Sequence, residues 1–142
     1  EKITALRMKP TIRFQSISVN NKRLNNFKEN QCFTHEKRKF EFVFKVNTLK
    51  YRENIKYHYK LFGANEAWTS LPYEKNEITY NALSPGKYTF IVRAENNGVF
   101  SAPCVFSFTI TTPYYQKWWF YLFILTSISV LIFLFFYNRF KK

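Results

Sequence analysis

The stretch that decides the fold class is residues 83–94, LSPGKYTFIVRA. From Tyr88 to Ala94 every second side chain is apolar, and this period of two is typical of a β-strand with one buried face. The pair Pro85-Gly86 just before it predicts a turn. The spacing from Leu83 to Tyr88 matches a tyrosine corner, in which the tyrosine hydroxyl bonds to backbone a few residues upstream. We therefore predict a structural turn that leads into a half-buried strand.

Other stretches before residue 112 share this period of two, namely 40–46, 57–61, 106–110 and, less regularly, 12–19. Asparagine and glycine pairs between them, such as Asn20-Asn21 and Asn97-Gly98, predict turns. Short strands with regular turns over about 110 residues predict an all-β fold, an immunoglobulin- or fibronectin III-like antiparallel β-sandwich. The polar segment 20–38 is expected to be a long loop or hairpin.

A second kind of segment follows the predicted sandwich. Residues 118–138 contain no charged side chain, and a helix of this length rises about 30 Å, enough to cross a bilayer core. Aromatic residues before and at its start predict an interfacial belt, formed by Tyr114, Tyr115, Trp118, Trp119 and Tyr121. The basic residues Arg139, Lys141 and Lys142 follow the span directly and predict a cytoplasmic C-terminus, with residues 1–117 outside. A buried core helix is the alternative interpretation.

The net charge of +13 invites a nucleic-acid hypothesis. An outer domain tethered to a membrane would not meet nucleic acid, so we predict no direct nucleic-acid partner. Attraction to anionic lipid headgroups and plain solvated strand faces remain as explanations of the basic surface. Trp68 has two interpretations as well: packing at the core or rim, or stacking on a sugar.

Sequence motifs for catalysis or metal binding are absent from the chain. There is no H-x-x-x-H spacing, no glycine-rich phosphate loop and no G-x-S-x-G, and a calcium loop needs aspartate, which the chain lacks. We expect no catalytic, cofactor-binding or metal-binding residue in this segment. Cys32 and Cys104 could pair in an oxidising compartment, but their spacing does not decide it.

Two stretches carry a family resemblance: 56–68, KYHYKLFGANEAW, and 78–101, ITYNALSPGKYTFIVRAENNGVFS. They resemble the triple-tyrosine (Y_Y_Y) domain of bacterial two-component sensors that carry β-propeller regulator repeats. The naming tyrosines would be Tyr59, Tyr80 and Tyr88, with Tyr57 an alternative to Tyr59. The other matching positions include Leu61, Gly63, Trp68, Leu83, Pro85, Gly86 and Phe90.

The resemblance implies that the chain is a segment of a longer sensor. Residues 1–9 would end a propeller region or linker, 10–112 would form the Y_Y_Y sandwich, 113–117 a connector, 118–138 the membrane helix and 139–142 the start of a cytoplasmic region. The segment would couple an upstream ligand-sensing propeller to a cytoplasmic output domain, most often a histidine kinase whose activity lies outside this chain.

The resemblance further implies a homodimer in the bacterial inner membrane, with residues 1–117 in the periplasm and the ligand bound on the propeller. The alternative function is a membrane-anchored, fibronectin-like adhesion or carbohydrate-binding module. The sequence after Lys142 would discriminate between these two functions.

Overall fold

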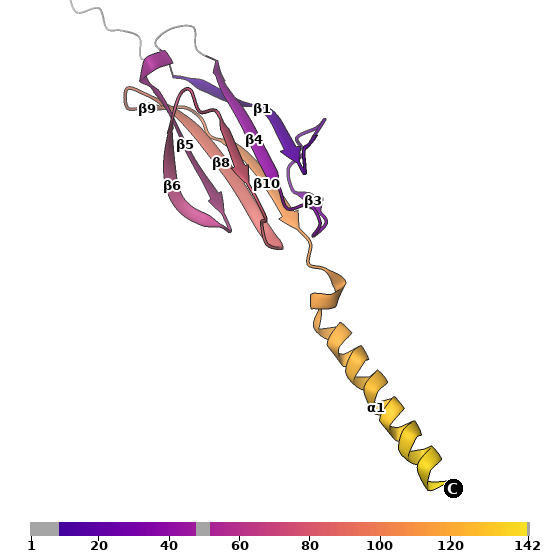
Figure 1. Cartoon of the computed structure of the whole chain (residues 1–142). Coiled ribbons are helices and arrows are strands. Elements are labelled where there is room, and N and C mark those ends of the chain that lie inside the picture. Colours follow the sequence, from indigo (N-terminus) through magenta and orange to yellow (C-terminus); the bar gives the residue numbers. More distant parts are fainter. Residues whose placement is uncertain (1–8, 48–51, 142) are drawn as a thin grey trace, which may run out of the picture. The chain divides into compact units, whose positions relative to one another are not determined.

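The computed structural model describes residues 9–47 and 52–141. The chain divides into two compact units, residues Glu1–Thr111 and Thr112–Lys142, which we describe separately. The first unit is built of strands in two sheets, and the second contains one long helix (Figure 1). These elements confirm the predicted fold class, an all-β sandwich followed by an apolar helix.

The first sheet has four antiparallel strands. Their spatial order is β2 (Lys22–Arg23), β1 (Thr11–Val19), β4 (Phe40–Asn47) and β7 (Glu77–Tyr80). The central strand β4 alternates between buried and more exposed residues along its whole length, as its sequence period predicts. The sheet therefore buries one face and leaves the other to solvent.

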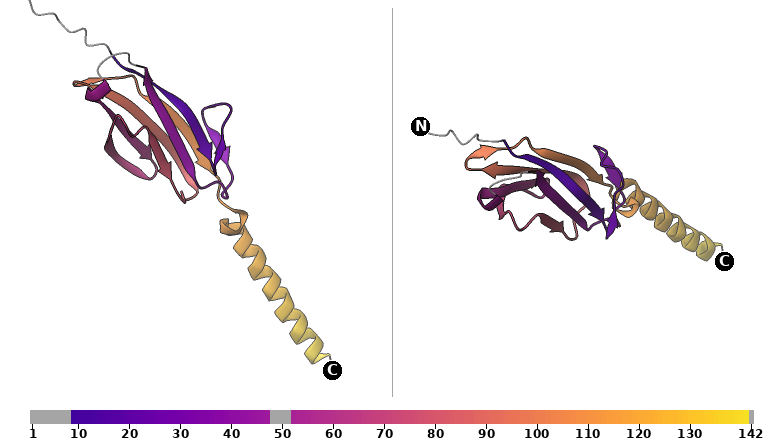
Figure 2. Two further views of the ribbon diagram at one scale, coloured as in Figure 1. Left: turned by 45° about the horizontal axis from the view of Figure 1, so that its top comes forward. Right: turned by 90° about the horizontal axis from the view of Figure 1, so that it is seen from above.

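The second sheet has six strands. Its main order is β3 (Gln31–Phe33), β10 (Cys104–Ile110), β8 (Gly86–Asn96), β5 (Ile55–Phe62) and β6 (Asn65–Pro72), and the short β9 (Val99–Phe100) pairs with β8. A 3-10 turn, η1 (Arg52–Asn54), leads into β5. Of the described pairings only β3 with β10 is parallel. Figure 2 shows the two sheets as two layers.

Aromatic rings fill the space between the two sheets. Phe42 of β4 stacks on Phe90 of β8 with 4.1 Å between ring centroids, and Phe40 stacks on Phe108 of β10 at 4.4 Å. These side chains are fully or almost fully buried, which removes their large apolar surface from water. The aromatic half of each alternating strand thus forms the core that joins the sheets.

The irregular period in 12–19 has a physical cause. The register between β1 and β4 shifts between Phe14 and Ser16, which marks a β-bulge. The bulge moves the inward-facing positions from even to odd numbers, so Ile12 and Ile17 are both buried although five residues separate them. A strict period of two could not have predicted this.

The segment 20–38 is more ordered than the expected long loop. It contains β2 and β3, which attach to the two different sheets. Asn20 and Asn21 adopt positive φ at the β1–β2 turn, and the Asn20 side chain accepts hydrogen bonds from the backbone of Arg38 and Lys39. The predicted turn at Asn20-Asn21 is confirmed, and the segment expected to be a long loop or poorly ordered hairpin is mostly loop but contains these two short strands.

The second unit begins with a short 3-10 turn, η2 (Tyr114–Gln116), followed by α1 (Trp118–Phe140). The backbone N–H groups of Gln116 and Lys117 donate to the carbonyls of Pro113 and Tyr114, which closes this turn. Helix α1 has 23 residues, so it is about 34 Å long, and it runs two residues beyond the expected end at 138.

Candidate functional site

The predicted tyrosine corner is present at the start of β8. The Tyr88 hydroxyl donates a hydrogen bond of 2.6 Å to the carbonyl of Ser84. Leu83 is buried beside it, its N–H donates to the Arg38 carbonyl, and its own carbonyl accepts from Arg38 Nε. This network ties the turn before β8 to the chain just before β4, so the motif has a structural role.

The three family tyrosines all contact the aromatic core. Tyr59 of β5 and Tyr80 of β7 each lie 6.2 Å from the ring of Phe90, and Tyr88 stacks on Phe108 at 5.4 Å. Tyr59 and Tyr80 belong to different sheets and meet over the same phenylalanine. The structure therefore brings together side chains that lie 29 residues apart, from 59 to 88.

Burial changes the chemistry of two core tyrosines. Desolvation raises the pKa of Tyr57 to about 12, with a further contribution from the neighbouring Tyr73. Desolvation also raises the pKa of Tyr80, and Tyr59 beside it acts in the same direction. Both hydroxyls are neutral at physiological pH, so the two side chains contribute packing but no charge.

The other family positions fall into two groups. Leu61 and Phe90 are fully buried, and Gly63 adopts φ +96° where an added Cβ would lie 2.5 Å from the carbonyl oxygen of Lys87. Trp68 behaves differently: it lies on the edge strand β6, is 40% exposed and contacts Lys60 and Arg93. The structure places it on the outer face of the six-stranded sheet and not in the core.

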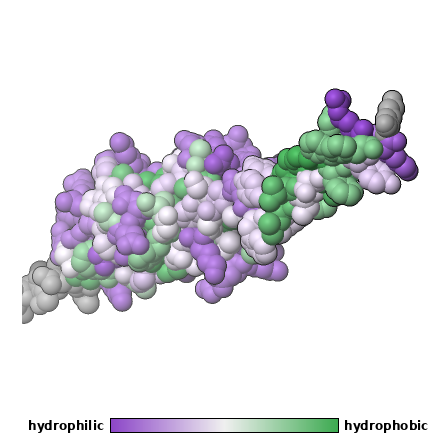
Figure 3. All heavy atoms as spheres, turned by 90° about the horizontal axis from the view of Figure 1, so that it is seen from below, coloured by the Kyte–Doolittle hydropathy of each residue, from purple (hydrophilic) through white to green (hydrophobic). Residues whose placement is uncertain are grey.

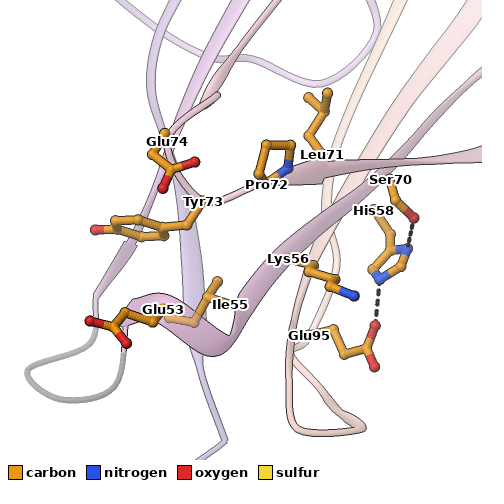
Figure 4. A pocket seen from close by; sticks show the side chains of 10 residues that line it. All are labelled: Glu53, Ile55, Lys56, His58, Ser70, Leu71, Pro72, Tyr73, Glu74 and Glu95. Carbon is orange, nitrogen blue, oxygen red and sulfur yellow. Dashed lines mark hydrogen bonds and ion pairs between the residues drawn. The ribbon is translucent and has the colours of Figure 1, made fainter.

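One polar cluster escaped the sequence analysis. His58 of β5 lies between Ser70 of β6 and Glu95 of β8, with 3.0 Å from Nδ1 to the serine Oγ and 2.5 Å from Nε2 to the glutamate Oε2 (Figure 4). The donor and acceptor roles of the two ring nitrogens depend on the tautomer: with a proton on Nε2, the Glu95 carboxylate accepts it and Nδ1 accepts from the Ser70 hydroxyl. Strand register alone brings these three residues together.

The cluster borders an open pocket of about 610 Å³. Glu53, Tyr73 and Glu74 line it together with the His58 cluster, as Figure 4 shows. The order serine, imidazole, carboxylate resembles a hydrolytic triad, but such catalysis also needs backbone donors aimed at an oxyanion. Ser70 lies in the middle of a strand, β6, opposite His58 of β5, and not at a turn whose backbone N–H groups converge on its hydroxyl. We therefore treat the cluster as polar surface structure.

The part of the chain that the structure describes contains neither a group of metal-binding side chains nor a disulfide bond. Within this part, no three histidine, cysteine, aspartate or glutamate residues are grouped to hold a metal ion. Cys32 and Cys104 are both free, so they do not form a disulfide. The Cys104 thiol donates to the Ile12 carbonyl at 3.0 Å, and burial raises its pKa.

The predicted interfacial residues lie in helix α1 and on either side of it. The helix is long and apolar enough to cross a membrane, and Figure 3 shows hydrophobic residues gathered over it. Of the predicted aromatic belt, Tyr114, Tyr115, Trp118, Trp119 and Tyr121 are all exposed. Arg139 lies in the last helical turn and Lys141 Nζ lies over the ring of Tyr137, while Lys142 is outside the described residues.

Solved structures of sensor proteins share the fold of the sandwich. The extracellular domain of a protein described as the one-component system BT4673 of B. thetaiotaomicron gives a TM-score of 0.62 at 21% identity and covers 75% of this chain. The extracellular domain of the hybrid two-component system BT3049 of that organism gives 0.61 at 22% identity and covers 73%. This chain spans only 16% of the length of either.

A search of curated proteins finds no match. The family model of the Y_Y_Y domain matches residues 49–111, which hold β5 to β10 and all three family tyrosines. Residues 49–111 of this chain are thus similar to the Y_Y_Y domain family, and the tyrosine corner and the shared fold agree with that match.

Proposed function

We propose that this chain is the extracytoplasmic signal-transmission module of a membrane-bound two-component sensor. It would couple an upstream ligand-sensing β-propeller to a cytoplasmic output domain, a histidine kinase outside this chain. The observation that carries the proposal is a sandwich that matches the Y_Y_Y family, followed, after residues 111–117 with the expected connector 113–117, by a helix of membrane-spanning length. This chain spans 16% of each similar extracellular domain, so most of those extracellular domains lies outside the matched part, which supports a further region before the sandwich.

The connector is short and ordered, which supports a mechanical role. Thr111 still donates its N–H to the Phe33 carbonyl, and Pro113 is buried just before the η2 turn. Residues 111–117 contain no glycine. A flexible glycine- and serine-rich linker would absorb a movement of the sandwich. A proline and a hydrogen-bonded turn make the linker stiffer, so that it can transmit the movement. A shift of the last strand would therefore pass into the helix.

The proposed mechanism uses two protomers. A change in the upstream sensor would alter how the two sandwiches are arranged, and the connectors would pass this change to the two membrane helices. The helices would then pair differently, so the output domains would populate a different one of two arrangements. The ligand needs to act only by binding one arrangement more tightly than the other.

Inserting a Gly-Ser-Gly-Ser segment after Thr112 in the full-length receptor tests this role. We expect ligand-dependent output to be lost while the receptor still folds and inserts, because the insertion breaks the connector without touching the core. The matched control is the same insertion between Asn97 and Gly98, an exposed turn at the β8–β9 hairpin away from the connector. Ligand-dependent expression of a reporter gene gives the output.

The control insertion should leave the response close to that of the wild type. If the insertion after Thr112 also leaves it intact, the module does not transmit through its connector and the proposal is wrong. Loss of response in both variants, with normal amounts of receptor in the membrane, would equally contradict it.

A further inference from the structure

The outer face of the six-stranded sheet carries alternating rings and cations that the transmission role does not use. Lys60 Nζ lies 4.1 Å from the ring centroid of Phe62 and 4.6 Å from that of Trp68. The Arg93 guanidinium carbon lies 4.2 Å from the ring of Trp68 and 4.0 Å from that of Phe100. We name these five side chains the cation–aromatic ladder. It joins strands β5, β6, β8 and β9.

The ladder exposes large apolar side chains at the surface. Phe62, Trp68 and Phe100 are 37%, 40% and 39% exposed, whereas the aromatic side chains on the inner face of the strands, such as Phe90, are fully buried. Exposed aromatic groups rimmed by polar residues mark binding surfaces on soluble domains. Their common position on one sheet face indicates one surface and not scattered rings.

Arg93 is prepared to bind an oxyanion. Its guanidinium lies against two rings, and its Nε is buried there without a hydrogen-bond partner among the described residues, so the terminal Nη groups are the donors that remain for a ligand. A guanidinium held flat by aromatic faces keeps its edge donors free, and these donors match the planar oxygens of carboxylate or the oxygens of sulfate. The stacking also lowers the entropy lost when such a group binds.

The charge of this face selects an anionic ligand. The side chains that alternate outward on β5 and β8 include Lys56, Lys60, Lys87 and Arg93 against the carboxylate of Glu95, and Glu66 of β6 is exposed as well. Four cations against these two carboxylates leave a net positive charge on the three strands. Electrostatic complementarity therefore favours a negatively charged partner and disfavours a second copy of this basic chain.

The neighbouring polar cluster narrows the class of ligand. His58 contacts the ring of Phe100 and belongs to the cluster with Ser70 and Glu95, so the ladder continues into the pocket of Figure 4. Glu53 and Glu74 also line that pocket, so we expect the acidic groups of a ligand at the ladder and its uncharged groups in the pocket. The same carboxylates accept hydrogen bonds from hydroxyl groups.

We propose that this outer face binds an acidic polysaccharide, a chain of sugar rings that carries carboxylate or sulfate groups. Its sugar rings stack on Trp68 and Phe100, its acidic groups bind Arg93 and Lys60, and its hydroxyls bind Ser70 and Glu95. The site is separate from the connector, so it does not depend on the transmission role.

The test measures binding of defined polymers to the chain in nonionic detergent micelles at about 0.15 M salt, where surface charge is partly screened. Dextran sulfate and polygalacturonate present sulfate or carboxylate on sugar rings. Dextran presents the rings without charge, and poly-L-glutamate presents charge without rings. We expect binding of at least one acidic polysaccharide. Dextran and poly-L-glutamate should bind at least about tenfold more weakly, because the loss of one charge-assisted hydrogen bond lowers an affinity by about this factor.

Matched variants locate the site. Trp68→Ala, Lys60→Gln and Arg93→Gln should each weaken the binding by about tenfold. Arg13→Gln and Lys45→Gln make the same charge change at exposed positions of the other sheet and should leave the affinity unchanged. Trp68→Phe keeps a ring and should retain most of the affinity. Circular dichroism confirms that each variant is folded.

Three results would overturn the proposal. Equal binding of poly-L-glutamate would assign the face to acidic peptides or to general charge attraction. Equal losses in Arg13→Gln and Arg93→Gln would show that net charge and not the ladder binds the polymer. Absence of binding to both acidic polysaccharides at millimolar sugar concentration would show that the face has another role.

Discussion

At the scale of single residues, the Tyr88 hydroxyl holds the turn before β8 through its 2.6 Å hydrogen bond to the Ser84 carbonyl. Tyr88→Phe removes this bond and keeps the ring on Phe108, so we expect a loss of about 1 kcal/mol in the free energy of unfolding. Urea unfolding of the chain in micelles, followed by circular dichroism, measures it. Tyr59→Phe is the control, because the Tyr59 hydroxyl makes no hydrogen bond among the described residues. Equal losses would contradict a specific role of the corner.

A comparison of Gly63 with Gly98 distinguishes the cost of a left-handed backbone from the cost of a steric clash. Gly63 and Gly98 adopt φ of +96° and +81°, but an added Cβ meets the Lys87 carbonyl only at Gly63 and open space at Gly98. Gly98→Ala should cost about 1–2 kcal/mol for the left-handed backbone. Gly63→Ala should cost roughly 1–3 kcal/mol more, because β5 and β8 must also move apart. The same unfolding measurement compares them, and equal costs would exclude the clash.

At the scale of elements, alternation along β5 buries Tyr57 between the ring of Phe44 at 4.7 Å and that of Tyr73 at 6.0 Å. Burial raises its pKa from 10.0 to about 12, so above pH 10 the unfolded chain loses the proton while the folded chain keeps it. The contribution to stability is therefore full below pH 10 and lost as the pH rises toward 12.

Tyr57→Phe removes the titrating hydroxyl, so it should flatten the fall in stability above pH 10. The difference in slope from the wild type should approach about 1.4 kcal/mol per pH unit, the value for one proton. Urea unfolding at pH 8, 10 and 11 measures the two slopes. Parallel slopes for the two proteins would mean that Tyr57 ionises equally well in the folded state.

The strands also show how much of the secondary structure could be predicted from the sequence. The strands β4, β5, β8 and β10 lie where alternation predicted them, because each buries one face over many consecutive residues. Strand β6 was missed, since it is an edge strand that is exposed over most of its length and so lacks alternation. The parallel pairing of β3 with β10 joins residues about 77 apart, which no local pattern reports.

At the scale of the whole molecule, the basic residues after the membrane helix predict its orientation. A receptor truncated after Lys142 and fused there to alkaline phosphatase should be inactive, whereas a fusion to a fluorescent protein should be bright. This result places the C-terminus in the cytoplasm and residues 1–117 in the periplasm. Replacing Arg139, Lys141 and Lys142 by glutamine should give a mixture of orientations. An active phosphatase fusion of the unchanged chain would reverse the proposed topology.

The sequence by itself determined the class of fold, the apolar helix, the tyrosine corner and the family resemblance. These depend on neighbours within a few residues, where side-chain periodicity, turn chemistry and hydropathy act directly. Only the tertiary structure decided that Trp68, Arg93 and Phe100 form one surface and that His58 meets Ser70 and Glu95. The reason is strand register: hydrogen bonding between β6, β5 and β8 brings residues from distant positions onto one face, and local sequence does not encode that pairing.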